Sequence, residues 1–350
     1  MKVAVVGATG NVGSAVLRAL QRDVRVREVV GIARRRPRVD VDKVTWRTAD
    51  ISRDDLLPVL EGADAVVHLA WLIQPSRDER VTYATNVEGS RRVFEAAVRA
   101  GAGAIVYASS IGAYSPGPKD RAVDESWATG GIPTSFYSRH KAAVERILDR
   151  VEEAHPHVRV ARLRPGLIFQ RDAASEIRRY FAGPFLPGRL VRRSMVPVIP
   201  RIPGLKVQAV HADDVAEAYR LVTAERAVGG AFNIAAEPPL DVDELARLLG
   251  ARTVPVPPLA VRALTGLTWK LRLQPTSPGW FDMALSVPLM DTSRARTELG
   301  WSARRSSGDA LLELMDGLRD GAGAPMPPLD PKTGGAVRER ELATGVGARL

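Results

Sequence analysis

A tyrosine and a lysine four residues apart form the most chemically informative pair in the sequence. Tyr137 and Lys141 fall in a segment of helical periodicity, so both side chains are expected on one face of a helix. A free tyrosine has a pKa of about 10 and is a poor base at neutral pH. A nearby lysine cation stabilises the phenolate and lowers that pKa. The pair is therefore predicted to exchange a proton with a substrate hydroxyl group.

Two serines follow an apolar, strand-like run at residues 104–107. A hydroxyl at the carboxyl end of that strand is placed to hydrogen-bond the same substrate oxygen as Tyr137 and to orient it. We predict Ser110 as the active serine, with Ser109 as the alternative. A tyrosine and a lysine also meet by chance on many helices, so this prediction depends on the other motifs and on their order along the chain.

A glycine-rich turn links the first predicted strand to a helix over residues 14–20. The glycines are spaced G-x-x-G-x-x-G, which differs from the general G-x-G-x-x-G pattern. They allow a tight turn and a close backbone approach, so that a pyrophosphate can bind the free N–H groups at the helix start. The predicted cofactor contacts in this turn are Gly7, Thr9, Gly10, Asn11, Val12 and Gly13.

The end of the second predicted strand indicates which dinucleotide binds. An acid at this place accepts hydrogen bonds from the ribose of NAD, whereas an arginine accommodates the 2′-phosphate of NADP. The strand at residues 29–32 is followed by Arg34, Arg35 and Arg36, and no carboxylate occurs before Asp40. Guanidinium groups bind phosphate in a bidentate manner. We therefore predict NADP, with NAD as the alternative, and Arg34 and Arg35 as contacts.

Apolar strand-like runs alternate with longer segments of helical period, which is typical of βαβ units. Their continuous Val, Ile and Ala content indicates burial on both faces, and hence a parallel sheet between helices. The predicted fold is α/β: a Rossmann-type, doubly wound, mostly parallel seven-stranded sheet with a small C-terminal substrate-side lobe. The runs lie at residues 3–6, 29–32, 65–69, 104–107, 158–163 and 231–235.

Composition changes along the chain suggest its domain boundaries. A Pro- and Gly-rich stretch follows Arg164 and Pro165, and helical periodicity returns at residues 213–223, 242–249 and 259–271. We expect residues 1–165 to form the dinucleotide-binding domain, to which residues 208–235 return. Residues 166–207 and 236–320 are expected to form the substrate-binding lobe. Residues 321–350 are rich in Gly, Pro and charge, and are expected to form a disordered tail.

The glycine-rich turn, Asn-Val-x-Gly at residues 86–89, the serine pair and Tyr-x-x-x-Lys occur in the order found in one family. Over roughly residues 1–315 the chain resembles the extended short-chain dehydrogenase/reductase superfamily, in its epimerase/dehydratase-like branch. The resemblance implies that Asn86 supports the catalytic site and that Tyr137 and Lys141 also contact the cofactor. It further implies cofactor contacts at Asp50, Ile51, Leu69, Ala70 and Pro165.

This resemblance implies an NAD(P)-dependent oxidoreductase that transfers a hydride at a carbonyl or hydroxyl carbon. A sugar or nucleotide-sugar epimerase and a non-catalytic NADP-binding sensor are the alternatives, although such sensors generally lose the Tyr-Lys pair. Dehydratases of the family carry an Asp-Glu pair where this chain has Ile111 and Gly112. Residues 167–170 also depart from the family's Tyr-Gly-Pro continuation, which puts a nucleotide-sugar substrate in doubt.

The charge and composition of the chain indicate which classes of partner it is expected to bind. The formal net charge is +10, but the arginines are dispersed and no basic run is interleaved with aromatic residues, so nucleic-acid binding is disfavoured. No apolar run approaches the roughly 18 residues of a spanning helix, and no membrane partner is expected. Without cysteine, a reducing, cytoplasmic location is expected. The expected partner is a small-molecule substrate, with a possible homodimer as in relatives.

His211 and Asp213 are the one pair that suggests a metal site. No further cluster of ligand-type residues accompanies them in the sequence. We therefore interpret them as a buried structural pair and predict no metal.

Overall fold

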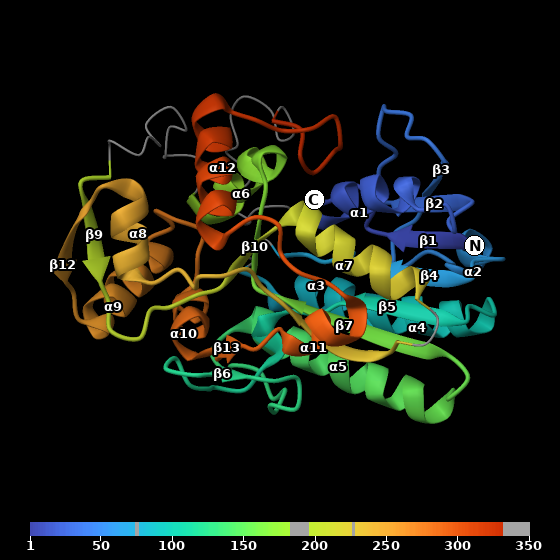
Figure 1. The fold of residues 1–350 in the computed structure, drawn as a ribbon, viewed down its shortest axis with the longest axis horizontal. Helices are drawn as coiled ribbons and strands as arrows, with labels where there is room; N and C mark the ends of the chain where they lie inside the picture. The colour runs from blue at the N-terminus through green and yellow to red at the C-terminus, as the bar shows by residue number, and fades with distance from the viewer. Residues whose placement is uncertain (74–76, 183–195, 226–227, 332–350) are drawn as a thin grey trace.

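The computed structural model describes residues 1–73, 77–182, 196–225 and 228–331. A sheet of seven parallel strands forms the centre, in the order β3-β2-β1-β4-β5-β7-β11 (Figure 1). This topology confirms the predicted doubly wound fold. The strands are β1 (Lys2–Val6), β2 (Glu28–Ala33), β3 (Val44–Thr48), β4 (Ala65–His68), β5 (Ala104–Ala108), β7 (Arg159–Pro165) and β11 (Gly230–Ile234).

Helices cover both faces of the sheet. In β1, Val3 and Val5 pack with the helices α1 (Asn11–Arg22) and α7 (Ala212–Ala224), whereas Ala4 and Val6 belong to the core on the opposite face. This alternation follows from the two-residue period of a strand. It explains why the strands are apolar at nearly every position. The second face is covered by α2 (Leu57–Leu60), α4 (Gly89–Arg99) and α5 (Phe136–Ala154).

The carboxyl edge of the sheet brings the predicted motifs together. Parallel strands all end at the same edge, and ligands in open α/β sheets bind outside that edge. The glycine-rich turn follows β1 there, and Ser110 follows β5 in the adjoining part of the sheet. A short helix α3 (Glu79–Tyr83) and a π-helical segment (Ala84–Glu88) follow β4 and lead into α4.

The remaining strands are short and lie outside the large sheet. They are β6 (Ala122–Val123), β8 (Leu167–Phe169), β9 (Val198–Arg201), β10 (Ala209–His211), β12 (Arg252–Pro255) and β13 (Leu289–Met290). The remaining helices are α6 (Ala174–Ile177), α8 (Val242–Leu249), α9 (Pro258–Lys270), α10 (Pro278–Ser286), α11 (Ser293–Leu299) and α12 (Ser307–Asp320). Figure 1 shows β9, β12, α8 and α9 gathered beyond one end of the sheet. We propose that this group belongs to the substrate-side lobe.

The segment after α12 differs from the prediction of a disordered tail. Met326 is 7% exposed and Leu329 is fully buried, and both pack into the core beside α1 and α7. Two apolar side chains therefore anchor residues 321–331, which otherwise consist mainly of Gly, Ala and Pro. Residues 332–350 and the Pro- and Gly-rich residues 183–188 lie outside the described residues. Among the described helices, none has the length and apolar content needed to cross a membrane.

Candidate functional site

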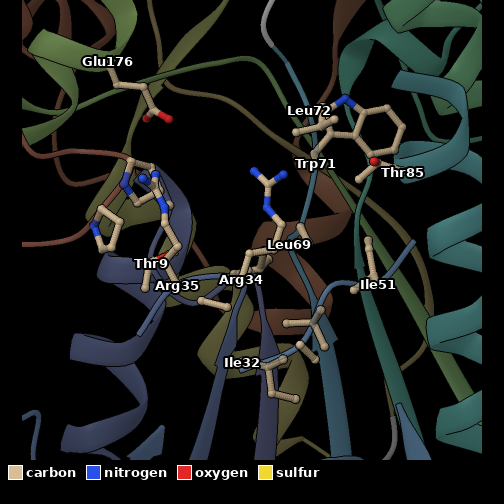
Figure 2. Close-up of a pocket in the computed structure, with 18 of the residues that line it drawn as sticks. Thr9, Ile32, Arg34, Arg35, Ile51, Leu69, Trp71, Leu72, Thr85 and Glu176 are labelled. Atoms are coloured by element: carbon tan, nitrogen blue, oxygen red, sulfur yellow. The ribbon is translucent and has the colours of Figure 1, made fainter. Parts of the chain in front are cut away.

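A cavity of about 460 Å³ opens at the carboxyl edge of the sheet (Figure 2). Its walls come from the β1–α1 turn, the ends of β2 and β4, and the segments around Thr85 and Glu176. In Figure 2 the side chain of Arg34 extends into the middle of this space. Eight of the predicted cofactor contacts line it: Gly7, Thr9, Gly10, Arg34, Arg35, Ile51, Leu69 and Ala70.

Two glycines of the turn are required by its geometry. Gly7 has a φ of 89°, and a Cβ atom there would lie 2.5 Å from the backbone nitrogen of Ala70. A Cβ at Gly13 would overlap the carbonyl oxygen of Gly7 and lie 2.7 Å from the carbonyl carbon of Ala8. The turn, the start of α1 and the segment after β4 therefore pack at separations that only glycine permits. Gly10 is under less constraint, because its Cβ would meet only the Gly7 oxygen at 3.6 Å.

The N-terminus of α1 is suited to an anion. No side chain caps it, and its first turn carries no acidic residue. Its N–H groups and the positive end of the helix dipole are therefore available to a phosphate beside Thr9 and Gly10. The glycine turn, the exposed arginines of the β2 end and the size of the cavity together fit a dinucleotide.

Several predicted contacts have other partners in this structure. The Asn11 side chain accepts a hydrogen bond of 2.6 Å from Gln170 and donates to the carbonyl of Ile168, which ties the turn to β8. The Asp50 carboxylate accepts hydrogen bonds from Ser52 N and Oγ, at 3.1 and 2.7 Å. Asn11, Val12, Gly13, Asp50 and Pro165 are not among the residues that line the cavity, so their cofactor contacts stay predictions.

Tyr137 lies in the first turn of α5, close to the end of β5. A Cβ at Gly112 would lie 2.9 Å from its Cε1 atom, so the aromatic ring packs directly on this glycine. Burial raises the pKa of Tyr137 to about 12, and a hydrogen bond with Ser110 acts in the opposite direction. The structure thus brings the predicted Ser110 and Tyr137 together. The other serine has a different role, because the Ser109 hydroxyl donates a hydrogen bond to the Glu145 carboxylate.

Lys141 does not lower the pKa of Tyr137 in this arrangement, contrary to the prediction. Its Nζ donates a hydrogen bond of 2.6 Å to the carbonyl of Ala108 and lies 3.5 Å from the ring centroid of Trp71. The ring centroid of Tyr137 is 5.7 Å away. Burial also holds the pKa of Lys141 well below its usual value. Spacing on the helix predicted proximity, but the sequence did not reveal how strongly burial disfavours both charges.

Two tryptophans flank Tyr137. The Trp280 ring is tilted by 35° against Tyr137 with 5.0 Å between centroids, and the Trp71 ring meets Tyr137 edge-on at 5.9 Å. Trp71 also lines the cavity, so one side chain contacts both the predicted cofactor site and the Tyr-Lys pair. The prediction did not include Trp71, although it follows directly after Leu69 and Ala70. Each indole Nε1 is a buried donor without a partner in the described structure.

Asn86 acts on the segment that carries Trp71. Its Oδ1 accepts a hydrogen bond of 2.7 Å from Leu72 N, and its Nδ2 donates one of 3.0 Å to Leu72 O. This two-way pairing fixes the backbone of the residue after Trp71. Asn86 itself is fully buried. The geometry therefore assigns a positioning interaction to Asn86, and its predicted place among the catalytic residues stays a prediction.

The outer wall of the cavity comes from segments that the sequence did not associate with it. Figure 2 shows Glu176 pointing towards the cavity from the side opposite Ile51. Burial raises the pKa of Glu176 to about 7, while the Arg179 charge and a hydrogen bond with Tyr180 act in the opposite direction. These wall residues are Glu176, Arg179, Tyr180, Pro327 and Pro328.

His211 forms the start of α7. Its Nδ1 accepts a hydrogen bond of 3.0 Å from Asp213 N, and its Nε2 lies 3.2 Å from the Glu313 carboxylate. Among the described residues, no group of three or more His, Asp or Glu side chains is arranged to hold a metal ion. His211 therefore caps the start of α7, and the Glu313 carboxylate lies beside its ring.

Several known proteins are similar to this chain. An uncharacterized protein of Mycobacterium tuberculosis is 26% identical over 90% of this chain. This chain spans only about 30% of the length of that relative. The L-arabinose 1-dehydrogenase (NAD(P)(+)) of Haloferax volcanii is 30% identical over 61% of this chain and 89% of its own. The structure of MoeE5 in complex with UDP-glucose and NAD is similar with a TM-score of 0.66, at 24% identity over 91% of this chain and 99% of that chain. The NAD dependent epimerase/dehydratase family matches residues 3–235, and the chain belongs to this family.

Proposed function

We propose that this chain is an NADP-dependent oxidoreductase that transfers a hydride at a carbonyl or hydroxyl carbon of a small molecule. The proposal rests on one observation: the cavity at the glycine turn and the Tyr-Lys pair share a wall residue. Trp71 lines the dinucleotide-sized cavity and also contacts Lys141 and Tyr137. A cofactor bound at the glycine turn therefore reaches the Tyr-Lys pair at the same edge of the sheet.

The chain's own residues supply the proton transfer. A nicotinamide cofactor would supply or accept the hydride at this site. The Tyr137 hydroxyl moves the proton of the substrate oxygen, and Ser110, its hydrogen-bond partner, orients that oxygen. Lys141 stabilises the phenolate once its ammonium group approaches Tyr137. Since Lys141 contacts Trp71 here, we propose that movement of the indole accompanies catalysis.

The preference for NADP rests on the end of β2. Arg34 and Arg35 line the cavity and are exposed to solvent, which suits a 2′-phosphate. We expect the double variant R34A/R35A to bind NADPH about tenfold or more weakly, because a hydrogen bond to a charged group contributes about 1.5–3 kcal/mol. Affinity for NADH should change little. Arg36→Ala is the matched control, since Arg36 is exposed and does not line the cavity. Equal losses for NADPH and NADH would refute the 2′-phosphate role.

The structure also bears on dehydration. Family dehydratases carry an acid at the place of Gly112, but a side chain there would press on the Tyr137 ring. A Cβ atom at this position would also lie 3.2 Å from Met283 Sδ. A carboxylate would therefore need a rearrangement of the site. This supports hydride transfer without dehydration.

The direct test is Tyr137→Phe. Turnover of NADPH with a panel of small ketones and aldehydes should fall about 10²- to 10⁴-fold, the usual contribution of a positioned acid–base group. Binding of NADPH should persist, since the cavity is lined by other residues. Tyr83→Phe is the control, because Tyr83 is 43% exposed. Full turnover by Tyr137→Phe would exclude the proposed proton transfer, and equal losses in both variants would indicate a folding defect.

A further inference from the structure

Exposed leucines are concentrated on α9 and the turn after it. Five of them have more than half of their surface in solvent: Leu259 (80%), Leu264 (62%), Leu267 (55%), Leu271 (60%) and Leu273 (57%). Elsewhere in the described chain, large apolar residues this exposed are isolated, as at Val24. Contiguous apolar surface of this kind marks an interaction site, whereas single exposed residues need no explanation.

Three of the leucines share one side of the helix. Leu264, Leu267 and Leu271 are spaced i, i+3 and i+7, which places them in a row along the surface. No residue of α9 is buried. Its opposite side packs on α10, where the Arg262 guanidinium pairs with the Asp282 carboxylate at 2.7 Å. Figure 1 places α9 at the end of the molecule, beyond the sheet and near α8 and β12.

Cations outnumber acids around these leucines, and the two flanking acids are already paired: Glu244 with Arg247, and Asp282 with Arg262. Residues 245–281 contain no Asp or Glu, but they carry Arg247, Arg252, Arg262, Lys270 and Arg272. At the C-terminal end of α9 the Arg77 guanidinium lies 4.8 Å from the centroid of the Trp269 ring. Burial and the nearby Arg272 charge lower the pKa of Arg77, so this end of α9 carries closely spaced cations. Within the part of the chain that the structure describes, neither Lys270 nor Arg272 pairs with an acid.

We propose that α9 docks on an anionic lipid surface, with its leucines between the head groups and Lys270 and Arg272 on the lipid phosphates. Exposed apolar residues bordered by cations that no acid pairs with are typical of helices that lie in a membrane interface. A second copy of the chain fits this surface less well, since pairing like faces would bring the same cations together. This proposal revises the expectation of no membrane partner. A surface helix needs one apolar side and no continuous apolar run.

The test is co-sedimentation of the full-length chain with vesicles of phosphatidylcholine, alone or with phosphatidylglycerol at about 30%. We expect binding to the anionic vesicles that weakens as salt is raised. L264D/L267D should bind at least about tenfold more weakly, because it removes apolar insertion. K270Q/R272Q should lose about thirtyfold on anionic vesicles, at about 1 kcal/mol for each cation. V24D is the control, since it places a single carboxylate at another exposed apolar position, away from α9.

Two results would overturn the proposal. One is equal partitioning of the wild type, V24D and both α9 variants, which would mean that α9 does not contact lipid. The other is a wild-type dimer in size-exclusion chromatography with light scattering that L264D/L267D dissociates, without vesicle binding. NADPH binding by each variant checks that it is folded, and it reports on a site that α9 does not line.

Discussion

Substitution of Glu176 by glutamine should change how cofactor affinity depends on pH. Glu176 lines the cavity together with Thr9 and Gly10, where the structure offers helix N–H groups to a phosphate. Burial raises the pKa of this carboxyl to about 7, so that it is half ionised at neutral pH. The negative charge of a bound cofactor disfavours ionisation of the Glu176 carboxyl, because like charges repel strongly in a buried site. Binding should therefore favour the protonated form, and affinity should fall as pH rises through 7.

The magnitude follows from the fraction of protonated Glu176. With a pKa of about 7, this fraction falls from about 0.9 at pH 6 to about 0.09 at pH 8. If only the protonated form binds, the apparent Kd rises about tenfold over this range, because it scales inversely with the competent fraction. Glu176→Gln keeps the shape and removes the charge. Its affinity should match the wild type at pH 6 and exceed it about tenfold at pH 8.

The assay is a fluorescence titration with NADPH at pH 6, 7 and 8. The 2′-phosphate itself titrates near pH 6, so the informative quantity is the ratio of wild-type to variant Kd at each pH. Glu237→Gln is a matched control: burial also raises the pKa of Glu237, which does not line the cavity. A ratio that stays constant from pH 6 to pH 8 would refute the reasoning, since Glu176 would then not sense the bound cofactor.

Two further predictions concern the turn and the core. Gly13→Ala should weaken NADPH binding at least about tenfold in the same titration, because the added Cβ atom overlaps the backbone of the turn. Gly10→Ala is the control and should be tolerated better, since a Cβ atom there has more room. Equal losses of affinity in the two variants would contradict this packing argument. Glu145→Ala should lower the free energy of unfolding in urea by about 3–5 kcal/mol, because it leaves the buried Arg164 guanidinium without the carboxylate that it binds at 2.6 and 2.8 Å. A loss under about 1 kcal/mol would show that Arg164 finds another partner.

Much of the fold could be predicted because local pattern and tertiary position agree. The interior strands are buried on both faces, so their sequences are continuous apolar runs, as at β1 and β5. The edge strand β3 is harder to recognise in the sequence, because only Trp46 of its five residues is buried and the strand is not a continuous apolar run. The glycine turn was predictable for a related reason. Close backbone approaches require glycine at Gly7 and Gly13, and that requirement is visible in the sequence.

The candidate site was predictable only where helix and strand geometry determine it. Residue spacing placed Tyr137 and Lys141 on one helix face, but burial opposes the ionisation of both. The rings that pack on Tyr137 are those of Trp71 and Trp280, which come from distant segments. Glu176 reaches the cavity through the packing of α6 against α12. No local pattern encodes such contacts, because they arise from tertiary packing.

The most direct test of the central claim is a parallel titration of the purified chain with NADPH and NADH. Trp71 lines the cavity, so energy transfer from tryptophan to a bound nicotinamide should report occupancy. We predict saturable binding at one site per chain, with NADPH bound more tightly than NADH. Absence of a saturable signal with both nucleotides would contradict the account, because the glycine turn and its cavity would then not be a dinucleotide site.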